Sequence, residues 1–325
     1  MSLHEAVRTP DRPGPGPIAD ALVRSLELKV RGRITGVLSG DHRSAMTGSG
    51  TELQTIREYV PGDDVRWIDW NATARTNTAQ VKTHVAERAL TTWLLLDTSP
   101  SMAFGTTIRR KADVAEGVAR VFGRVATRRN NRLGFVTFGG SQRRSAPARQ
   151  GRAGLVELLT ALAATDPSAT FTGVPAHQHH KGRGALGDAE SLTEALHIVA
   201  NLQRSRSVIV IVSDFRDNDN SWLQPLREAT ARHDVIVCEI GDPRENELPN
   251  VGELTLIDPE TGAQLRVDTS SRKIRERFAQ AATADRSDLR LQIEAAHADH
   301  LVLQTGDDWL RSLAGFLETR SEIRK

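Results

Sequence analysis

The sequence predicts an α/β protein whose core is a doubly wound, mostly parallel sheet, preceded by a loop-rich N-terminal arm. Two observations carry this prediction. From residue 91 onward, short apolar runs alternate with helical stretches that are long enough to connect neighbouring parallel strands. Before residue 91 the chain is polar, rich in glycine and proline, and shows no such alternation. We therefore expect a flexible tail over residues 1–17, the arm over residues 18–90 and one α/β domain over residues 91–325.

Within the arm, only two segments have a regular pattern. The apolar spacing over residues 18–30 is mainly helical, and Gly32 and Gly36 then break it. Residues 37–90 are polar, and only residues 81–89 show a weak alternation typical of a strand. We therefore expect a short helix, a turn and a long segment of loops.

Four apolar runs in the domain indicate buried strands, because a strand covered on both faces carries apolar residues at consecutive positions. These runs are residues 93–96, 133–138, 208–212 and 235–240. Helical stretches follow them or lie between them, at residues 109–128, 154–164, 191–204 and 222–233. Strands that alternate with helices in this way favour a largely parallel sheet.

The last part of the chain has a different pattern. Residues 258–262 have the composition of a turn and lie between two short strand-like runs, which predicts a hairpin of residues 253–257 and 264–267. The remaining expected elements are a long helix at 274–296, a strand at 300–303 and a helix at 308–317.

Size and charge exclude several classes of protein. The chain has 325 residues, of which 38% are hydrophobic, so it can bury one large core or two modest ones. It carries 43 Lys and Arg residues against 41 Asp and Glu residues, scattered along the whole chain. A formal net charge of +2 is too small to indicate a basic surface that binds nucleic acid, and we expect no nucleic-acid partner.

Cysteine usage and hydropathy indicate the compartment. The single cysteine, Cys238, lies in an apolar run, which predicts a buried, unreactive thiol and suits a reducing environment. No run approaches the roughly 18 consecutive apolar residues of a membrane span. The N-terminal segment lacks the charged and apolar regions of a signal peptide. We therefore expect a cytoplasmic protein without a membrane span.

Oxygen-bearing side chains gather where the first strand of the domain ends. Asp97 follows strand 93–96 directly, and Ser99 and Ser101 follow at alternate positions. Open α/β sheets bind their ligands at this carboxyl end of the strands. Because Mg2+ prefers oxygen ligands and keeps some of its waters, one carboxylate and two hydroxyls on a tight loop suit an open Mg2+ or Mn2+ site.

A second carboxylate comes from another strand. The run at residues 208–212 is followed by Ser213 and Asp214, which places Asp214 at the same edge of the sheet as Asp97. The alternative interpretation is that Asp97 and the two serines only cap a turn and the next helix. Two apolar strands that both lead into an aspartate favour the metal site over capping.

The pattern Asp97-x-Ser99-x-Ser101 after a hydrophobic strand resembles the metal-ion-dependent adhesion site, or MIDAS, of von Willebrand factor A-like domains. The resemblance begins at about residue 91 and implies that fold for the domain. In that family a threonine from a second loop and an aspartate from a third loop complete the site. The aspartate corresponds to Asp214 here.

The threonine of the family has no clean counterpart. Where the family has it, this sequence has Glu190, with Ser191 and Thr193 as near neighbours. The resemblance therefore leaves the fourth ligand open among these three residues, and with it the affinity for metal.

A denser motif upstream of the first strand resembles the bacterial family called domain of unknown function 58. The motif reads REYVPGDDVRWIDW at residues 57–70, and the family joins it to a segment that reads DTSPSMAFG here, at residues 97–105. The arm residues that this resemblance marks are Arg57, Tyr59, Gly62, Asp63, Asp64, Arg66, Asp69, Trp70 and Arg75.

The charged residues of this motif can serve two purposes. Arginines pair with carboxylates through two parallel hydrogen bonds, so they can form a salt-bridged clasp that fixes the arm against the α/β core. Alternatively they contact a ligand directly. We expect the clasp, with Trp67, Ile68 and Trp70 as its apolar anchors.

The family resemblance also implies a role. Members resemble accessory proteins of MoxR-type AAA+ ATPases, which act in a chaperone-like way to remodel or mature client proteins. The sequence has no phosphate-binding loop of its own, so any use of ATP belongs to a partner. We expect a non-enzymatic adaptor in which a bound Mg2+ keeps one open position for a carboxylate of a partner protein.

Two alternatives remain at this stage. In a metal-dependent phosphoryl hydrolase, Asp97 would be the nucleophile. Phosphatases of the haloacid dehalogenase type have a second aspartate two positions later, where this chain has Ser99. In a metal-free scaffold, the domain would bind partners without any ion.

Overall fold

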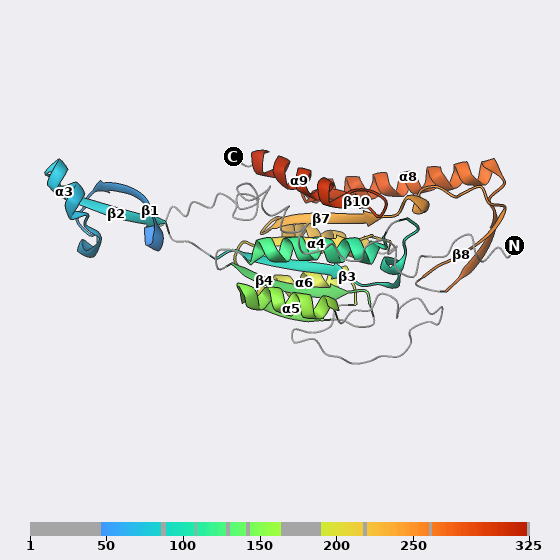
Figure 1. The fold of residues 1–325 in the computed structure, drawn as a ribbon, viewed down its shortest axis with the longest axis horizontal. Coiled ribbons are helices and arrows are strands. Elements are labelled where there is room, and N and C mark those ends of the chain that lie inside the picture. The colour runs from blue at the N-terminus through green and yellow to red at the C-terminus, as the bar shows by residue number, and fades with distance from the viewer. Residues whose placement is uncertain are drawn as a thin grey trace. The chain divides into compact units, whose positions relative to one another are not determined.

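The computed structural model describes residues 47–85, 89–107, 109–127, 131–140, 144–163, 190–216, 220–259 and 262–323. The chain forms two compact units, one with Ser39–Ala89 and one with Leu90–Ile323 (Figure 1). We call the first the arm unit and the second the core unit. The tail expected over residues 1–17 and the helix expected over residues 18–30 lie outside the described residues.

The arm unit contains a two-stranded antiparallel sheet and two short helices. Strand β1 (Thr47–Glu58) pairs with β2 (Gln80–Val85), and η2 (Val65–Trp67) and α3 (Trp70–Thr76) lie in the connection between the strands. The expectation of loops over most of residues 37–90 is therefore wrong for the described part. The alternation of β1 is hidden because glycines and two register irregularities interrupt it.

Asp69 fixes the start of α3. Its carboxylate accepts hydrogen bonds from the backbone N–H groups of Asn71, at 2.9 Å, and Ala72, at 3.1 Å. Lys82 Nζ lies 3.3 Å from the second carboxylate oxygen. The helix ends at Asn77, which has a left-handed backbone with φ of 58°. A capping carboxylate of this kind stabilises a helix by about 1 kcal/mol.

The core unit is built on a six-stranded sheet with the order β10-β7-β6-β3-β4-β5. All neighbouring strands are parallel except β4 and β5, which confirms the predicted mostly parallel α/β fold. The strands are β3 (Thr91–Asp97), β4 (Arg132–Phe138), β5 (Ser145–Gln150), β6 (Val208–Ser213), β7 (Asp234–Gly241) and β10 (Asp299–Gln304). The antiparallel edge strand β5 was not expected, because it has no run of large apolar residues and includes Pro147.

Helices cover both faces of this sheet (Figure 1). They are α4 (Lys111–Ala126), α5 (Arg152–Ala163), α6 (Leu192–Leu202), α7 (Leu223–Thr230), α8 (Arg272–Ala295) and α9 (Trp309–Ile323). Side chains of α4, α5 and α9 pack with Leu94 and Leu96 of β3, whereas side chains of α6, α7 and α8 pack with Trp93 and Leu95. The central strand is therefore buried on both faces, and each such side chain contributes roughly 1.5–3 kcal/mol.

Two smaller predictions about the core unit are confirmed. Strands β8 (Glu253–Ile257) and β9 (Gln264–Asp268) form the expected antiparallel hairpin. Cys238 is a buried free cysteine, and burial raises the pKa of its thiol to about 12. The thiol is therefore protonated and unreactive at neutral pH.

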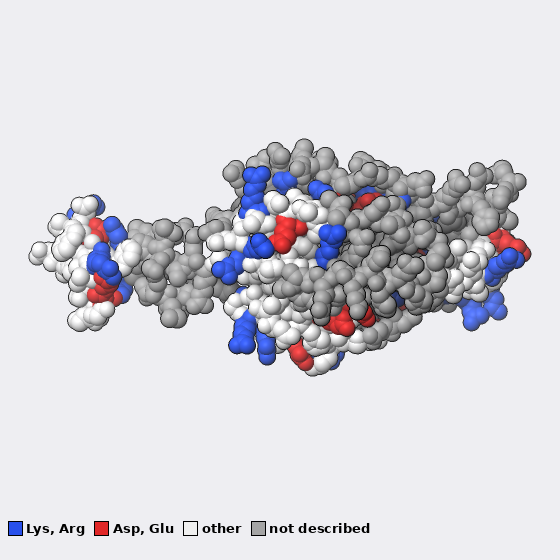
Figure 2. Space-filling model, turned by 90° about the horizontal axis from the view of Figure 1, so that it is seen from below, with Lys and Arg blue, Asp and Glu red and all other residues white. Residues whose placement is uncertain are grey.

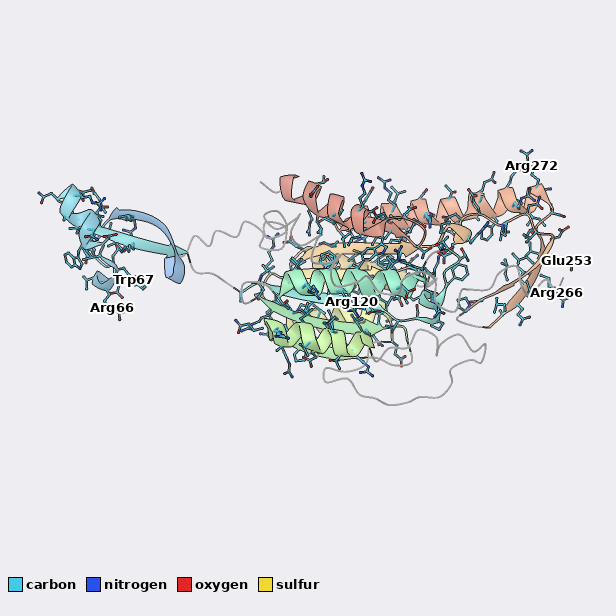
Figure 3. All side chains as sticks on the ribbon, viewed as in Figure 1. Arg66, Trp67, Arg120, Glu253, Arg266 and Arg272 are labelled. Atoms are coloured by element: carbon cyan, nitrogen blue, oxygen red, sulfur yellow. The ribbon has the colours of Figure 1, made fainter. Side chains whose placement is uncertain are left out.

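The described surface mixes charges of both signs. Figure 2 shows Lys and Arg side chains standing singly or in small groups among uncharged residues, with Asp and Glu side chains nearby. Glu253, Arg266 and Arg272 are examples at the hairpin and the start of α8 (Figure 3). Within the described residues, no helix combines the length and the apolar character that crossing a membrane requires.

The packing of α4 against α9 gives a first testable prediction. A Cβ atom at Gly117 would lie 2.4 Å from Trp309 Cζ2, in a fully buried contact. Although alanine favours a helix over glycine by about 1 kcal/mol, overpacking costs roughly 1–3 kcal/mol. Gly117→Ala should therefore lower the free energy of unfolding, as measured by urea denaturation.

Gly315→Ala is the matched control for this substitution. Gly315 also lies inside a helix, but a Cβ atom there would meet nothing within 4 Å. This variant should be more stable than the wild type by about 0.5–1 kcal/mol. Equal gains from both substitutions would contradict the tight packing described for Trp309.

Candidate functional site

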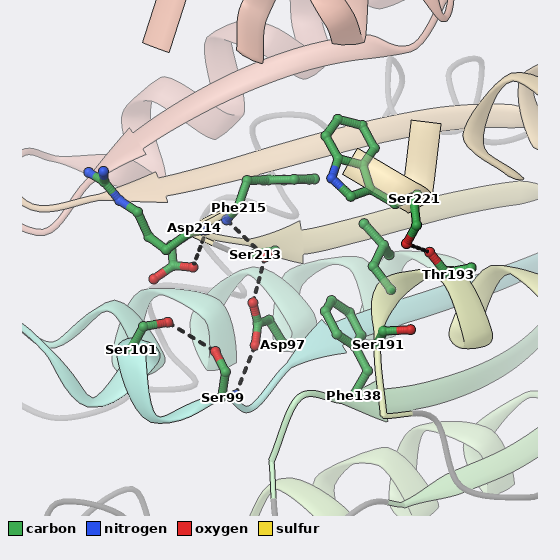
Figure 4. A pocket seen from close by; sticks show the side chains of 13 residues that line it. Asp97, Ser99, Ser101, Phe138, Ser191, Thr193, Ser213, Asp214, Phe215 and Ser221 are labelled. Atoms are coloured by element: carbon green, nitrogen blue, oxygen red, sulfur yellow. Dashed lines mark hydrogen bonds between the residues drawn. The ribbon is translucent and has the colours of Figure 1, made fainter. Parts of the chain in front are cut away.

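Asp97 ends β3, and its carboxylate is held from two sides. Oδ1 accepts a hydrogen bond from the backbone N–H of Ser99 at 2.8 Å, and Oδ2 accepts one from the hydroxyl of Ser213 at 2.5 Å (Figure 4). The residue is only 8% exposed. The first contact is a turn cap, as the alternative interpretation expected. The second contact joins the end of β3 to the end of β6.

Ser99 and Ser101 lie close together beside this carboxylate. Ser99 precedes η3 (Pro100–Ala103), and the tight turn brings the two hydroxyl oxygens to 3.0 Å from each other. Figure 4 shows both serines grouped with Asp97 and Asp214. The loop after β3 therefore presents hydroxyl and carboxylate oxygens to one small volume.

Asp214 reaches the same place from β6. Strand β6 is a direct neighbour of β3, and Leu96 pairs with Val212 at the ends of the two strands. Asp214 is buried, and its Oδ1 accepts a hydrogen bond from the backbone N–H of Arg216 at 3.2 Å. The two aspartates therefore converge because adjacent parallel strands end at the same edge of the sheet.

The backbone after Asp214 has an unusual conformation. Phe215 has φ of 52°, a left-handed value that is rare for a bulky side chain and costs on the order of 1–3 kcal/mol. Its ring packs edge-on against Trp222, with 5.2 Å between the ring centroids. This turn directs the backbone of Arg216 toward Asp214 and places both aromatic rings at the wall of the pocket.

Most of the predicted metal ligands line one pocket that is open to solvent. Its lining includes Asp97, Ser99, Ser101, Ser191, Thr193 and Asp214. Glu190 is not part of the lining. The backbone N–H of Glu190 donates to the carboxylate of Glu194 at 2.5 Å, at the start of α6.

The start of α6 brings two more hydroxyl groups to the pocket. Ser191 is the N-cap of α6, and its hydroxyl accepts a long hydrogen bond from the N–H of Glu194 at 3.4 Å. The hydroxyl of Thr193 lies 2.7 Å from that of Ser221. Of the three fourth-ligand candidates, the structure thus places Ser191 and Thr193 at the pocket.

Electrostatics makes a cation favourable here. Burial raises the pKa of Asp97 to about 7, and the nearby charge of Asp214 raises it as well. Hydrogen bonds from Ser213 and Ser99 act in the opposite direction. The metal-free site therefore resists holding two negative charges, and a bound cation would remove that resistance.

The sequence did not predict that Lys111 belongs to this cluster. Lys111 is fully buried, and its Nζ lies 2.5 Å from Asp214 Oδ2 and 2.7 Å from Glu245 Oε1. Burial alone lowers the pKa of Lys111, but the two carboxylates outweigh burial and raise it. The side chain is therefore a permanent cation. One signal was available, because Lys111 falls on the apolar stripe of α4 together with Val114 and Val118.

Three further side chains of the cluster were also missed. Ser213 donates to Asp97, and Arg216 lines the pocket with its Nη2 atom 3.5 Å from Glu245 Oε2. Glu245 belongs to η7 (Pro243–Glu245), beyond the end of β7. Ser213 and Arg216 flank Asp214 in sequence and could have been suspected. Nothing in the sequence around Glu245 points to this site.

The donor set fits a hard divalent cation. The described residues contain no group of three or more His, Cys, Asp and Glu side chains that could hold a metal. The site instead offers two carboxylates together with hydroxyl groups, and these oxygen donors suit Mg2+ or Mn2+. Asp97, Ser99, Ser101 and Asp214 are the residues that would hold the ion, with water in the remaining positions.

The marked residues of the arm unit pair among themselves. Arg57 donates two hydrogen bonds of 2.7 Å to the carboxylate of Asp63, and Arg66 donates to Asp64 at 2.6 Å. The expected ion pairs thus exist, and both lie inside the arm unit. Gly62 has φ of 110° and allows the turn between the paired residues.

The apolar anchors of the arm differ from expectation. Trp70 is 71% exposed within the described chain, and Trp67 is 39% exposed. Arg66 and Trp67 both project from η2 in Figure 3. Tyr59 is half-buried, and its backbone N–H donates to Ala79; Arg75 is exposed in the last turn of α3. The two tryptophans therefore do not form a buried core for this unit.

The sheet, its two covering layers of helices and the site at its carboxyl edge define an α/β domain of the von Willebrand factor A-like type. The family model described as "Protein of unknown function DUF58" matches residues 55–288. The chain belongs to this family, as the upstream motif predicted.

Several mycobacterial proteins and solved structures are similar to this chain. Uncharacterized proteins of Mycobacterium bovis and Mycobacterium tuberculosis are each 38% identical over 300 residues, which is 92% of this chain and 89% of the relative. The crystal structure of the conserved hypothetical protein BatB from Bacteroides thetaiotaomicron matches with a TM-score of 0.41 and 12% identity, covering 72% of this chain and 99% of that one. The SpRpn10 VWA domain matches with a TM-score of 0.36 and 12% identity, covering 70% and 94%.

Proposed function

We propose that this protein is a metal-dependent adaptor that binds other proteins and performs no chemistry of its own. A Mg2+ or Mn2+ ion held by Asp97, Ser99, Ser101 and Asp214 would keep one open position, which a carboxylate of a partner protein would fill. The observation that carries this proposal is the convergence of these oxygen donors in one solvent-open pocket. Among the described residues that line it, none is a histidine or a cysteine.

The partner in this proposal is a MoxR-type AAA+ ATPase, which acts with the adaptor on client proteins. The support for it is membership of the family, together with the resemblance of that family to accessory proteins of such ATPases. The ATPase would supply the energy of nucleotide hydrolysis, and the adaptor would hold the client.

Calorimetric titration of Mg2+ and Mn2+ into the metal-free protein tests the metal site. We expect saturable binding by the wild type and none by Asp97→Asn or Asp214→Asn. Asp307→Ala is the control, because Asp307 is an exposed aspartate of the same unit. Binding that survives in both site variants would disprove the site.

Co-purification tests the adaptor role. The wild type should retain its MoxR-type ATPase in the presence of Mg2+ and lose it when the metal is chelated. The Asp97→Asn variant should fail to retain the ATPase under both conditions. Retention of the ATPase by this variant would contradict a metal-bridged contact.

A hydrolase is the second candidate, and one observation favours it. Arg216 lines the same pocket as Asp97, where a guanidinium could hold a phosphate group. Turnover of a generic phosphate ester that disappears in Asp97→Asn would support the hydrolase. We expect no turnover by the wild type, because Ser99 occupies the position of the second aspartate of the haloacid dehalogenase type.

A further inference from the structure

Lys111 is a permanently charged side chain that contacts one of the predicted metal ligands, Asp214. It is the first residue of α4 and is fully buried, so neither solvent nor a partner protein can reach it. Its ammonium group bridges Asp214 Oδ2, at 2.5 Å, and Glu245 Oε1, at 2.7 Å. One of the proposed metal ligands therefore already has a positive partner.

The rest of the cluster fixes Lys111 in this place. The other carboxylate oxygen of Glu245 accepts a hydrogen bond from the backbone N–H of Asp242 at 2.9 Å and lies 3.5 Å from Arg216 Nη2. The ring of Phe104 lies 5.7 Å from the Lys111 ammonium. At the other end of the bridge, Asp214 Oδ1 accepts a hydrogen bond from the backbone N–H of Arg216, so we expect the ammonium to stay in place when a metal ion binds.

The charges of the cluster can be counted when all its groups are ionised. The three carboxylates of Asp97, Asp214 and Glu245 face the two side-chain cations of Lys111 and Arg216, which leaves one negative charge. A divalent ion changes this to one positive charge. A single carboxylate from outside would then make the cluster neutral, and an uncompensated charge in a buried site is costly.

We propose that Lys111 weakens the binding of metal alone and makes it depend on a carboxylate supplied by a protein partner. This inference rests on the proposed metal-dependent adaptor and adds a regulatory residue to it. Metal and partner would bind cooperatively because each offsets the charge that the other leaves behind. The adaptor would then hold its metal tightly only while it holds a partner.

Lys111→Met removes the charge and keeps most of the volume. We expect this variant to bind Mg2+ at least tenfold more tightly than the wild type in chloride buffer, measured by calorimetry. Acetate is the probe for the partner carboxylate. Replacing chloride by acetate should tighten Mg2+ binding at least threefold in the wild type and leave Lys111→Met unchanged.

Two further variants separate charge from structure. Lys111→Met combined with Glu245→Gln has the same net charge as the wild-type cluster, so its Mg2+ affinity should return to within threefold of the wild type. Glu245→Gln alone makes the metal-bound cluster more positive and should weaken Mg2+ binding at least tenfold. If Lys111→Met does not fold, Glu245→Gln alone tests whether the net charge of the cluster controls Mg2+ binding. Lys82→Met, which removes a partly buried lysine of the arm unit, should leave the Mg2+ affinity unchanged.

The outcomes also separate this inference from the proposed function. If the wild type and Lys111→Met bind Mg2+ equally, Lys111 is only structural and the inference fails, while the adaptor proposal stands. If only Lys111→Met binds Mg2+, in chloride and in acetate alike, the inference stands and the metal dependence of the native adaptor fails. If neither protein binds Mg2+ in either buffer, both ideas fail.

Discussion

Asp97→Asn should have opposite effects on the metal-free and the metal-loaded protein. In metal-free protein at pH 8, the substitution removes a buried negative charge that the site disfavours and should stabilise the protein by about 2.5 kcal/mol. The melting temperature should therefore rise by roughly 5–10 °C, at roughly 2–4 °C for each kcal/mol. With Mg2+ present, the wild type should gain stability from the ion, and the variant should gain none. Differential scanning calorimetry with and without Mg2+ measures both effects.

The pH dependence of this effect follows from the pKa of Asp97. Burial and the charge of Asp214 raise that pKa from 3.8 to about 7 in the folded protein. A raised carboxyl pKa means that the folded state disfavours the charged form, so the metal-free wild type loses stability as the pH rises from 3.8 through 7. The advantage of Asp97→Asn should therefore be larger at pH 8 than at pH 5. An equal advantage at both pH values would contradict this origin.

Asp242→Ala should be strongly destabilising. Asp242 is fully buried just after β7, and its carboxylate accepts hydrogen bonds from the hydroxyl of Thr106 at 2.5 Å and the hydroxyl of Thr305 at 2.6 Å. The backbone N–H groups of Thr106 and Arg244 also donate to it. Losing this acceptor leaves several buried donors unpaired, which should lower the free energy of unfolding by at least about 3 kcal/mol.

This loss should shrink at acid pH. Burial raises the pKa of Asp242, but the hydrogen bonds from Thr106 and Thr305 and from the two backbone N–H groups outweigh burial and lower it. A carboxyl group whose pKa is lowered by folding stabilises the folded protein at pH values above the ordinary carboxyl pKa. This stabilisation disappears as the pH falls through the pKa of the group in the folded state. Urea denaturation at pH 7 and pH 3 should show a smaller difference between wild type and variant at pH 3. Asp307→Ala is again the control.

The fold and half of the candidate site could be predicted because both depend on local patterns. Apolar runs mark strands, and parallel strands end at one edge, so Asp97 and Asp214 could be placed together without coordinates. Lys111 and Glu245 could not, because they reach the site through the packing of α4 and of the segment after β7. A lysine on the apolar face of a helix signals burial but does not name its partner.

In the arm, the sequence indicated that ion pairs form but did not indicate the helix α3. Its charged residues indicated ion pairs, and Arg57 with Asp63 and Arg66 with Asp64 form them. Their sequence separation is short, so the pairs stabilise turns inside the unit. The clasp of the arm against the core stays a prediction. Helix α3 was not predicted, although its N-cap, Asp69, is a residue type favoured at helix starts.

The contact between Ser213 and Asp97 has a consequence for folding. It joins residues 116 positions apart, at the ends of the two central strands β3 and β6. An ion held by Asp97 and Asp214 can exist only after these strands have paired, which is a slow step because long chain segments must first be closed. Metal would therefore protect the backbone amides of the central strands from hydrogen exchange, because their exchange requires this pairing to break. The amides of the β8–β9 hairpin, which can open locally, would exchange as fast as before.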